Sequence, residues 1–347
     1  MCPEQQEASL SVEGEPGSPE GEGRLELAFS AVSADRPSRE AVVAFKFGGS
    51  SLLGAERMLH SAGLVRETAF RSRVCVVVSA MKGVTDRLLA VAERLARNET
   101  QKARRQAEDI AALHLETLEE LKLAEGKHER VEQEVQLLSR DLLHETPRQG
   151  RVEVNDFLRD RLASFGERYA VRLFAAALGK IGVPAVPVAS SDFVLTCETF
   201  RDAKPHLEHT ERHGREILKP LLEAGIVPVV TGFIGATEDG RITTLGRNSS
   251  DLSGALVAHV LDAEELVIWT DVDGIYTANP RDSDEAKLLH ELSYDEAHAL
   301  AASGAKVLHP EVLPLAAKRE MTVWVRNTFK PHARGTRIGS QQNGGVA

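Results

Sequence analysis

Short apolar segments alternate with helical segments along most of this chain, and no other feature of the sequence constrains the fold as much. Runs of β-branched and aliphatic residues predict strands at residues 41–47, 73–79, 184–188, 226–231, 241–245, 266–271 and 321–326. Apolar residues at helical spacing predict helices at residues 55–70, from 85 onward, 156–179, 249–261, 294–303 and 311–319. Strands that alternate with helices favour a mainly parallel sheet covered on both faces. We therefore predict an α/β protein with three layers, α/β/α.

Three segments depart from this alternation. Residues 94–143 are charged and rich in helix-forming residues but lack a sustained heptad, which favours a helical hairpin laid over the domain. Residues 1–40 are rich in Glu, Gly, Ser and Pro, which predicts a disordered acidic tail. Residues 340–347 are polar and contain glycine, which predicts a frayed C-terminal tail. A single domain is expected to occupy residues 41–339.

Composition and charge exclude several classes of protein. The formal net charge of the 347 residues is -10, which argues against a nucleic-acid partner. No apolar run approaches the roughly 20 residues of a membrane span, and the N-terminus lacks the basic and apolar regions of a signal peptide. Cys2, Cys75 and Cys197 have no metal-type spacing. We therefore expect a cytoplasmic protein that binds neither membrane nor nucleic acid.

The first predicted strand runs directly into a lysine and two glycines, Lys46-Phe47-Gly48-Gly49. Backbone N–H groups at such a turn can surround an anion, and the helix that follows adds a favourable dipole. Lys46 supplies a positive charge for phosphoryl oxygens. The segment is not a Walker A loop, in which the lysine follows the glycines. Taken alone, two glycines after a strand more often form a plain turn than a phosphate site, and both interpretations remain open at this point.

Six segments in a fixed order carry a family resemblance. They are Lys46-Phe47-Gly48-Gly49-Ser50, Ser164-Phe165-Gly166-Glu167, Thr231-Gly232-Phe233-Ile234-Gly235, Thr244-Leu245-Gly246-Arg247-Asn248-Ser249-Ser250-Asp251, Trp269-Thr270-Asp271-Val272-Asp273-Gly274-Ile275-Tyr276 and Gly304-Ala305-Lys306-Val307-Leu308-His309-Pro310. Together they resemble the catalytic domain of an aspartokinase, in the amino acid kinase superfamily, over about residues 42–338. The motif sequences are most similar to those of the kinase half of bifunctional aspartokinase–homoserine dehydrogenases. The resemblance implies an amino acid kinase-like fold, which agrees with the predicted layers.

The resemblance also implies which residues form the site. Lys46 and Asp251 would be catalytic. ATP would contact Lys46, Phe47, Gly48, Gly49, Thr270, Asp271, Tyr276, Arg281, Lys306 and Val307. The amino acid substrate would contact Ser79, Thr85, Glu167, Phe233, Arg247, Asn248, Ser249 and Ser250. Within this set, Glu167 would bind the α-ammonium group, and the planar guanidinium of Arg247 would bind a carboxylate through two parallel bonds.

The activity that the resemblance implies is ATP-dependent phosphorylation of the side-chain carboxylate of L-aspartate. The product, 4-phospho-L-aspartate, is the first intermediate toward lysine, threonine and methionine. Because the carboxylate is already ionised near pH 7, catalysis needs alignment and charge neutralisation and no general base, which disfavours a catalytic role for His309. Mg²⁺ would be held mainly by ATP phosphates, without a dedicated protein metal site. Two alternatives remain open: a kinase of another small amino acid or carboxylate, and a weakly active partner subunit.

Two features depart from the family pattern. Ser249 stands where aspartokinases commonly have glycine, which costs little at negative φ and roughly 1 kcal/mol or more in a left-handed conformation. The regulatory modules common in aspartokinases, and a dehydrogenase domain, are not recognised in the sequence. We therefore expect a homodimer, or association with a separate regulatory chain.

Overall fold

The computed structural model describes residues 41–278, 285–302 and 308–340. The predicted tail at residues 1–40 and almost all of the one at residues 340–347 lie outside these ranges. Three predicted nucleotide contacts, Arg281, Lys306 and Val307, also lie outside the described residues. None of the helices within these ranges combines the length and the apolar character needed to cross a membrane.

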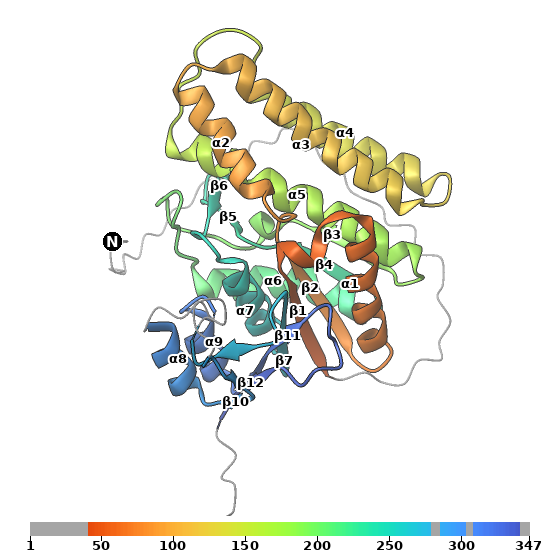
Figure 1. Cartoon of the computed structure of the whole chain (residues 1–347), viewed down its shortest axis with the longest axis vertical. Coiled ribbons are helices and arrows are strands. Elements are labelled where there is room, and N and C mark those ends of the chain that lie inside the picture. The colour runs from red at the N-terminus through yellow and green to blue at the C-terminus, as the bar shows by residue number, and fades with distance from the viewer. Residues whose placement is uncertain (1–40, 279–284, 303–307, 341–347) are drawn as a thin grey trace, which may run out of the picture.

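The centre of the molecule is an eight-stranded sheet in the order β10-β12-β11-β7-β1-β2-β4-β3 (Figure 1). Strands β11, β7, β1, β2, β4 and β3 are parallel, whereas β12 is antiparallel to β11 and parallel to β10. The strand bounds are β1 (Val42–Phe47), β2 (Arg73–Val78), β3 (Ala185–Val188), β4 (Val227–Thr231), β7 (Glu265–Thr270), β10 (Glu291–Leu292), β11 (Thr322–Asn327) and β12 (Thr336–Ile338). The predicted mainly parallel sheet is confirmed.

Helices cover both faces of the sheet, because alternate residues of each strand point to opposite sides. Phe45 and Phe47 of β1 enter the core shared with α1 (Gly54–Ala69), α2 (Val84–Ala96) and α5 (Asp156–Lys180). Ala44, directly before Phe45, belongs to the opposite core, which includes residues of α7 (Ser250–Val260) and α9 (Val312–Lys318). Helix α6 (Leu207–Glu223) packs on the same side, and α8 (Tyr294–Ala302) follows β10. The predicted three-layer α/β/α fold is therefore confirmed.

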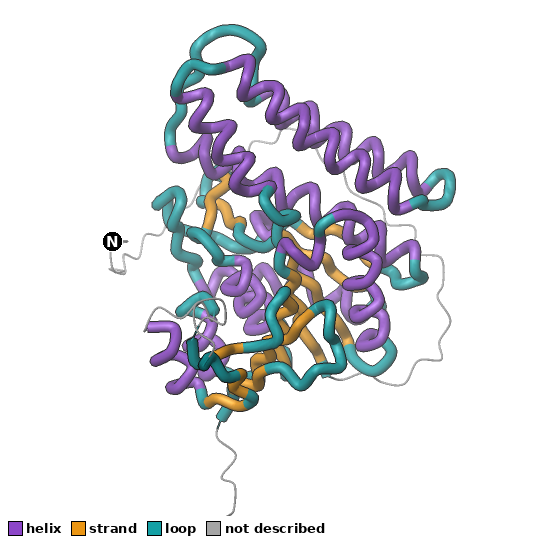
Figure 2. The backbone as a smooth tube through the Cα atoms, in the orientation of Figure 1, coloured by secondary structure: helices purple, strands orange, loops and turns teal. Residues whose placement is uncertain are grey.

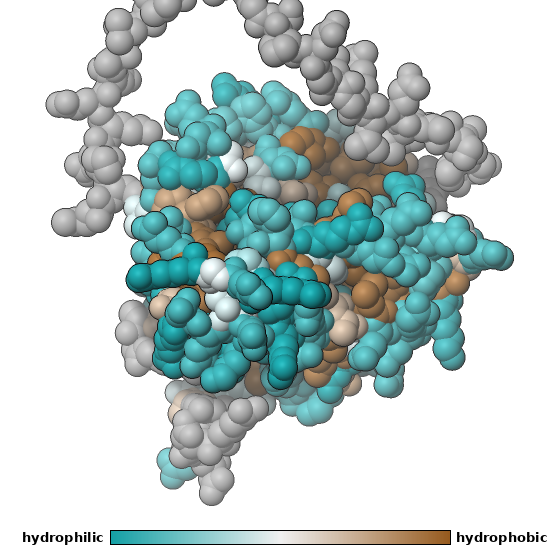
Figure 3. Space-filling view, turned by 90° about the horizontal axis from the view of Figure 1, so that it is seen from above, coloured by the Kyte–Doolittle hydropathy of each residue, from teal (hydrophilic) through white to brown (hydrophobic). Residues whose placement is uncertain are grey.

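The predicted helical hairpin is formed by α3 (Thr100–Leu121) and α4 (Lys127–His144), which lie outside α2 and α5 (Figures 1 and 2). Its buried leucines join the same core as α5. His114 stacks on Tyr169 of α5 with ring centroids 4.1 Å apart, and the Tyr169 hydroxyl donates to Ser139 Oγ of α4 at 2.9 Å. Figure 3, which shows the molecule of Figure 1 from above, shows a mainly hydrophilic face with groups of hydrophobic residues between the hydrophilic ones.

Several elements differ from the sequence prediction. The predicted strand at residues 241–245 is β6 (Ile242–Thr244), which pairs only with β5 (Ile234–Ala236) in a separate antiparallel ribbon. A second ribbon joins β8 (Ile275–Tyr276) to β9 (Leu288–Leu289). Helix α6 was not predicted, and neither were the short strands β10 and β12. β10 and β12 have two and three residues, which is too short for a recognisable pattern, whereas α6 has apolar residues at helical spacing and was overlooked.

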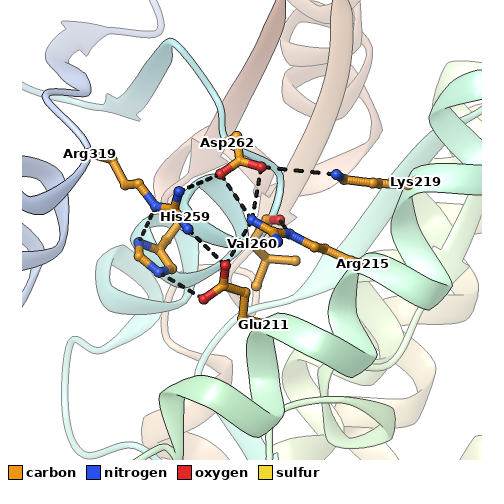
Figure 4. A network of polar contacts seen from close by, with 7 residues as sticks. All are labelled: Glu211, Arg215, Lys219, His259, Val260, Asp262 and Arg319. Carbon is orange, nitrogen blue, oxygen red and sulfur yellow. Dashed lines mark hydrogen bonds and ion pairs between the residues drawn. The ribbon is translucent and has the colours of Figure 1, made fainter.

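A network of charged side chains ties α6 to the ends of α7 and α9 (Figure 4). Glu211 of α6 accepts from Arg215 and from Arg319, each at 2.8 Å. Asp262, just after α7, pairs with the same two arginines at 2.8 to 3.0 Å. His259 is buried beside Glu211, with its Nε2 atom 3.5 Å from the carboxylate. The network therefore holds three helices together behind the sheet.

Candidate active site

The predicted site residues gather at the edge of the sheet where four adjacent parallel strands end. Phe47 of β1 is in register with Val78 of β2 and with Trp269 of β7, and Val78 is in register with Thr231 of β4. The carboxyl ends of these strands therefore form one row. In open α/β sheets, ligands bind beyond this edge.

The glycine turn after β1 packs closely against the loop after β2. A Cβ atom at Gly49 would lie 2.6 Å from the Ala80 carbonyl oxygen and 2.9 Å from the Lys82 nitrogen, so no larger residue fits there. The Gly48 N–H donates to the Trp269 carbonyl at 3.0 Å, and the Lys82 N–H donates to the Gly49 carbonyl at 3.1 Å. The turn is thus fixed against β7 and against the loop after β2. Its second glycine, Gly49, is the first residue of the 3₁₀-helix η1 (Gly49–Leu52).

Lys46 and Asp251 meet beneath this turn. The Lys46 ammonium lies 2.7 Å from Asp251 Oδ1, and both side chains are largely buried, with 11% and 17% of their surface exposed. Asp251 is the second residue of α7, where the helix dipole favours a negative charge. A Cβ atom at Gly254, one turn later, would lie 3.1 Å from Lys46 Cβ. Gly254 was not predicted as a site residue, yet its lack of a side chain makes room for the lysine.

Glu167 lies on α5 with only 2% of its surface exposed. Its Oε1 atom accepts from the Ala80 N–H at 3.0 Å, and its buried Oε2 atom has no partner among the described residues. Burial raises the pKa of Glu167 to about 8, although the Ala80 N–H and the charge of Lys46 oppose the shift. A Cβ atom at Gly166 would lie 2.5 Å from Ala80 Cβ. The absence of a side chain at Gly166 thus lets the loop that carries Ala80 pack directly against α5.

The segment with Arg247 to Ser249 forms the turn between β6 and α7. Arg247 is 78% exposed and pairs at 3.0 Å with Asp86 of α2, which is 77% exposed. Asn248 has a positive φ of 63°, but Ser249 has φ -79°. The serine therefore adopts an ordinary conformation, and its hydroxyl donates to the Gly246 carbonyl at 2.7 Å. Replacing glycine by serine at this position costs no backbone strain.

The remaining predicted substrate contacts surround the same space. Ser79 directly follows β2, and Thr85 is the second residue of α2. Phe233 follows β4 with a φ of 69°, and its N–H donates to Ser253 Oγ of α7 at 2.8 Å. Ser250 is the first residue of α7 and is almost fully buried. The structure thus brings the predicted substrate residues to one end of the sheet, between α2, α5 and α7.

The described part of the predicted nucleotide site lies beyond β7. Asp271 is 3.6 Å from the Lys82 ammonium. Burial alone would raise the pKa of Asp271, but the Ser50 hydroxyl and Lys82 lower it below its ordinary value. Thr270 ends β7, and Tyr276 belongs to the small ribbon of β8 and β9. Burial lowers the pKa of His309, which favours its neutral form.

Metal-binding side chains do not cluster in this region. Within residues 41–278, 285–302 and 308–340, no three His, Cys, Asp or Glu side chains converge as a metal site would require.

Comparison with known proteins gives the same assignment at the level of the family. The profile of the amino acid kinase family matches residues 41–327. The chain is 34% identical over 297 residues to lysine-sensitive aspartokinase 3 of Escherichia coli, covering 86% of this chain and 64% of that protein. It is 33% identical to chloroplastic aspartokinase 1 of Arabidopsis thaliana, covering 84% of this chain and 51% of that protein. The chain thus spans less than two thirds of the length of these relatives.

A solved structure agrees with both the sequence and the fold. The crystal structure of E. coli aspartokinase III in complex with aspartate and ADP superposes with a TM-score of 0.76 at 33% identity. The match covers 87% of this chain and 65% of that one. Because the family profile spans nearly all of the sheet and its covering helices, the chain belongs to the amino acid kinase family.

Proposed function

We propose that this chain transfers the γ-phosphoryl group of ATP to the side-chain carboxylate of L-aspartate and forms 4-phospho-L-aspartate and ADP. The observation that carries the proposal is the Lys46–Asp251 pair, which lies beside the glycine turn and at the same sheet edge as the unpartnered oxygen of Glu167. The related E. coli structure, which contains aspartate and ADP, supports this choice of substrates. The reaction would be the first step of lysine, threonine and methionine biosynthesis.

The amino acid would be held at both of its charged α-groups. Glu167 would receive the α-ammonium, which completes the hydrogen bonding of the buried Oε2 atom. Arg247 would leave Asp86 and bind the α-carboxylate through its guanidinium. Ser79, Thr85, Phe233, Asn248 and Ser250 would line the space around these groups. Ser249 is fully buried and would instead support the turn through its hydrogen bond to Gly246. This arrangement directs the side-chain carboxylate toward Lys46 and the glycine turn.

In the transfer step, one side-chain carboxylate oxygen attacks the γ-phosphorus. The bond from that phosphorus to the oxygen that bridges to the β-phosphate breaks, and its electrons remain on ADP. No proton has to be removed, so alignment and charge neutralisation are the chemistry that the protein must supply. Lys46 would contact the phosphoryl oxygens beside Gly48 and Gly49. The Gly49 N–H would donate to these oxygens, whereas the Gly48 N–H already donates to the Trp269 carbonyl and holds the turn in place. Asp251 orients the lysine through their ion pair.

The nucleotide would lie beyond β7, against Thr270, Asp271 and Tyr276, with Arg281, Lys306 and Val307 as further contacts. The contact predicted for Phe47 is not retained, because this residue is fully buried in the core. Mg²⁺, bound mainly by the phosphates, would neutralise part of their charge. We further propose that residues 41–339 form the catalytic domain, that the protein acts in the cytoplasm, and that it forms a homodimer or associates with a separate regulatory chain.

A hydroxylamine assay tests the proposed reaction. Purified protein with ATP, Mg²⁺ and hydroxylamine should yield the hydroxamate of aspartate, because hydroxylamine traps acyl phosphates. Hydroxamate formation with a different amino acid or carboxylate, and not with aspartate, would identify that compound as the substrate. A complete lack of signal would favour the weakly active subunit.

A matched pair of variants tests the role of Lys46. Lys46→Met should lower turnover by about 100-fold or more, because it removes a charge placed at the transferring phosphoryl group. Lys102→Met removes the same charge from an exposed side chain of α3 and should leave turnover unchanged. Equal activity of the two variants would exclude the assigned role.

A further inference from the structure

A second buried carboxylate lies on the same helix as Glu167 but outside the space assigned to the substrate. Asp160 of α5 is 2% exposed. It precedes Glu167 by seven residues, which is about two helical turns or ~10 Å along the axis, so both side chains leave the helix on the same face. No role has been assigned to Asp160 so far, and buried carboxylates without a cation are rare because their burial is costly.

The Asp160 carboxylate accepts three hydrogen bonds from two separate loops. Its Oδ2 atom accepts from the Arg201 N–H and from the Thr244 N–H, each at 2.8 Å. Its Oδ1 atom accepts from the Thr244 hydroxyl, also at 2.8 Å. Burial raises the pKa of Asp160, and these hydrogen bonds oppose the shift. The backbone N–H groups of Arg201, in a loop, and of Thr244, at the end of β6, thus both donate to a single carboxylate on α5.

Thr244 lies at the start of the turn that carries Arg247. It is the last residue of β6, and its carbonyl accepts from the Ala203 N–H at 2.9 Å. Arg201 has a positive φ of 71°, so the loop that donates to Asp160 is itself held in an uncommon conformation. Gly246 approaches this loop closely, since a Cβ atom there would lie 2.8 Å from Asp202 Oδ1. The Arg247 turn is therefore anchored to α5 through Asp160.

We propose that Asp160 is a positioning residue that sets the separation between Glu167 and Arg247, and so determines the affinity for the amino acid substrate. The helix between Asp160 and Glu167 fixes one end of the substrate site relative to the other. The nucleotide groups on β1 and β7 do not depend on this connection, since they are held by the Gly48 contact to Trp269. This inference rests on the proposed function, because it assumes that Glu167 and Arg247 bind the same molecule.

The positioning role predicts a selective kinetic effect. Asp160→Ala should raise the KM for aspartate by about tenfold, because small displacements of binding groups weaken substrate contacts strongly. The KM for ATP should change less than about twofold, since the phosphate-binding turn does not contact Asp160. A purely structural defect would instead lower the active fraction and leave both KM values unchanged.

Asp160→Asn is the rescue variant. Its amide oxygen can accept from both N–H groups, and its amide nitrogen can donate to the Thr244 hydroxyl, which then acts as an acceptor. The KM for aspartate should therefore stay within about threefold of that of the unmodified protein. Thr244→Val, which removes only the hydroxyl, should raise the KM for aspartate by about threefold without changing that for ATP. If Asp160→Ala fails to fold, the KM values of Asp160→Asn and Thr244→Val still test whether Asp160 has the positioning role.

Ser139→Ala is the matched control, because it removes a buried hydrogen bond to Tyr169 on the other side of α5. It should destabilise the protein without a selective change in the KM for aspartate. Equal changes in both KM values for Asp160→Ala and Thr244→Val, or the same selectivity in Ser139→Ala, would overturn the proposal.

Amide hydrogen exchange separates this inference from the proposed function. Asp160→Ala should accelerate exchange in residues 198–206 and 242–250, and Asp160→Asn should not, whatever the substrate. Activity of the unmodified protein with aspartate tests the function by itself. If the two loops exchange alike in all variants, Asp160 does not anchor them, even if aspartate is the substrate.

Discussion

Replacing Glu167 by glutamine should stabilise the folded protein while it removes the group that receives the α-ammonium. The Glu167 side chain is almost fully buried, and only one of its oxygens has a partner among the described residues. Glutamine has nearly the same shape, and its oxygen can still accept from the Ala80 N–H. The substitution therefore removes an ionisable group without creating a cavity.

The expected size of the effect follows from the pKa of Glu167. Burial raises this pKa from the ordinary 4.5 to about 8. A raised carboxyl pKa means that the folded state keeps a proton that the unfolded state loses, so stability falls as the pH rises from 4.5 to 8. At pH 7, roughly 2.5 pH units above the ordinary pKa, the loss amounts to about 3 kcal/mol, since each unit is worth about 1.36 kcal/mol. This loss of folding free energy is an upper bound, because the protein around the ionised carboxylate can relax and lower the cost of burying the charge.

Urea unfolding at pH 5, 7 and 8.5 measures the effect. The variant should be more stable than the unmodified protein by an amount that increases with pH and becomes constant above pH 8. Glu116→Gln makes the same chemical change at an exposed position of α3 and should give a difference that does not depend on pH. If the stabilities of Glu167→Gln and the unmodified protein have the same pH dependence, the Glu167 carboxyl is not desolvated as described. Aspartate should stabilise only the protein that retains Glu167.

Three further predictions follow from charged and ionisable side chains. Because Glu167 must be ionised to bind an ammonium group, the KM for aspartate should fall by close to tenfold per pH unit up to about 8, in initial-rate measurements. Asp86→Asn should lower that KM by about threefold, since Asp86 competes with the substrate for Arg247, and high salt should reduce the difference. Burial lowers the pKa of His114 to about 4, so the free energy of unfolding should decrease as the pH falls from 6.5 to 4, and His114→Phe should remove part of this loss in acid titrations.

The sequence predicted the main sheet well because its strands carry their own signal. Runs rich in valine and other aliphatic residues became β1, β2, β4 and β7, and a glycine directly follows β1 and β4. The pairing of β6 could not be predicted in this way, since the ladder that joins it to β5 is made of backbone groups present in every residue. Helix α6 could have been predicted, since its apolar residues, among them Leu218 and Leu222, recur at helical spacing between the charged ones.

The predicted site residues were identified through their order in a family pattern, and most of the described ones lie at one sheet edge. Gly254 and Asp160 were not identified, because their roles depend on neighbours that are distant in sequence. The absence of a side chain at Gly254 is needed only because the Lys46 side chain lies against it. Asp160 has its role only because the backbone N–H groups of Arg201 and Thr244 donate to its carboxylate. The sequence identified Ser249 as a departure from the family pattern, but it could not predict that this residue has a negative φ.

The hairpin of α3 and α4 projects from the molecule in Figure 1 as though it were a detachable module. Its leucines are continuous with the core that contains Phe165 and Phe174, and its polar residues bond to the outer side of α5. The inner side of that helix carries Glu167 and Asp160. A deletion or an insertion that disturbs the hairpin would therefore expose the outer side of the helix that carries Glu167 and Asp160, so we expect the hairpin and the proposed site to unfold cooperatively.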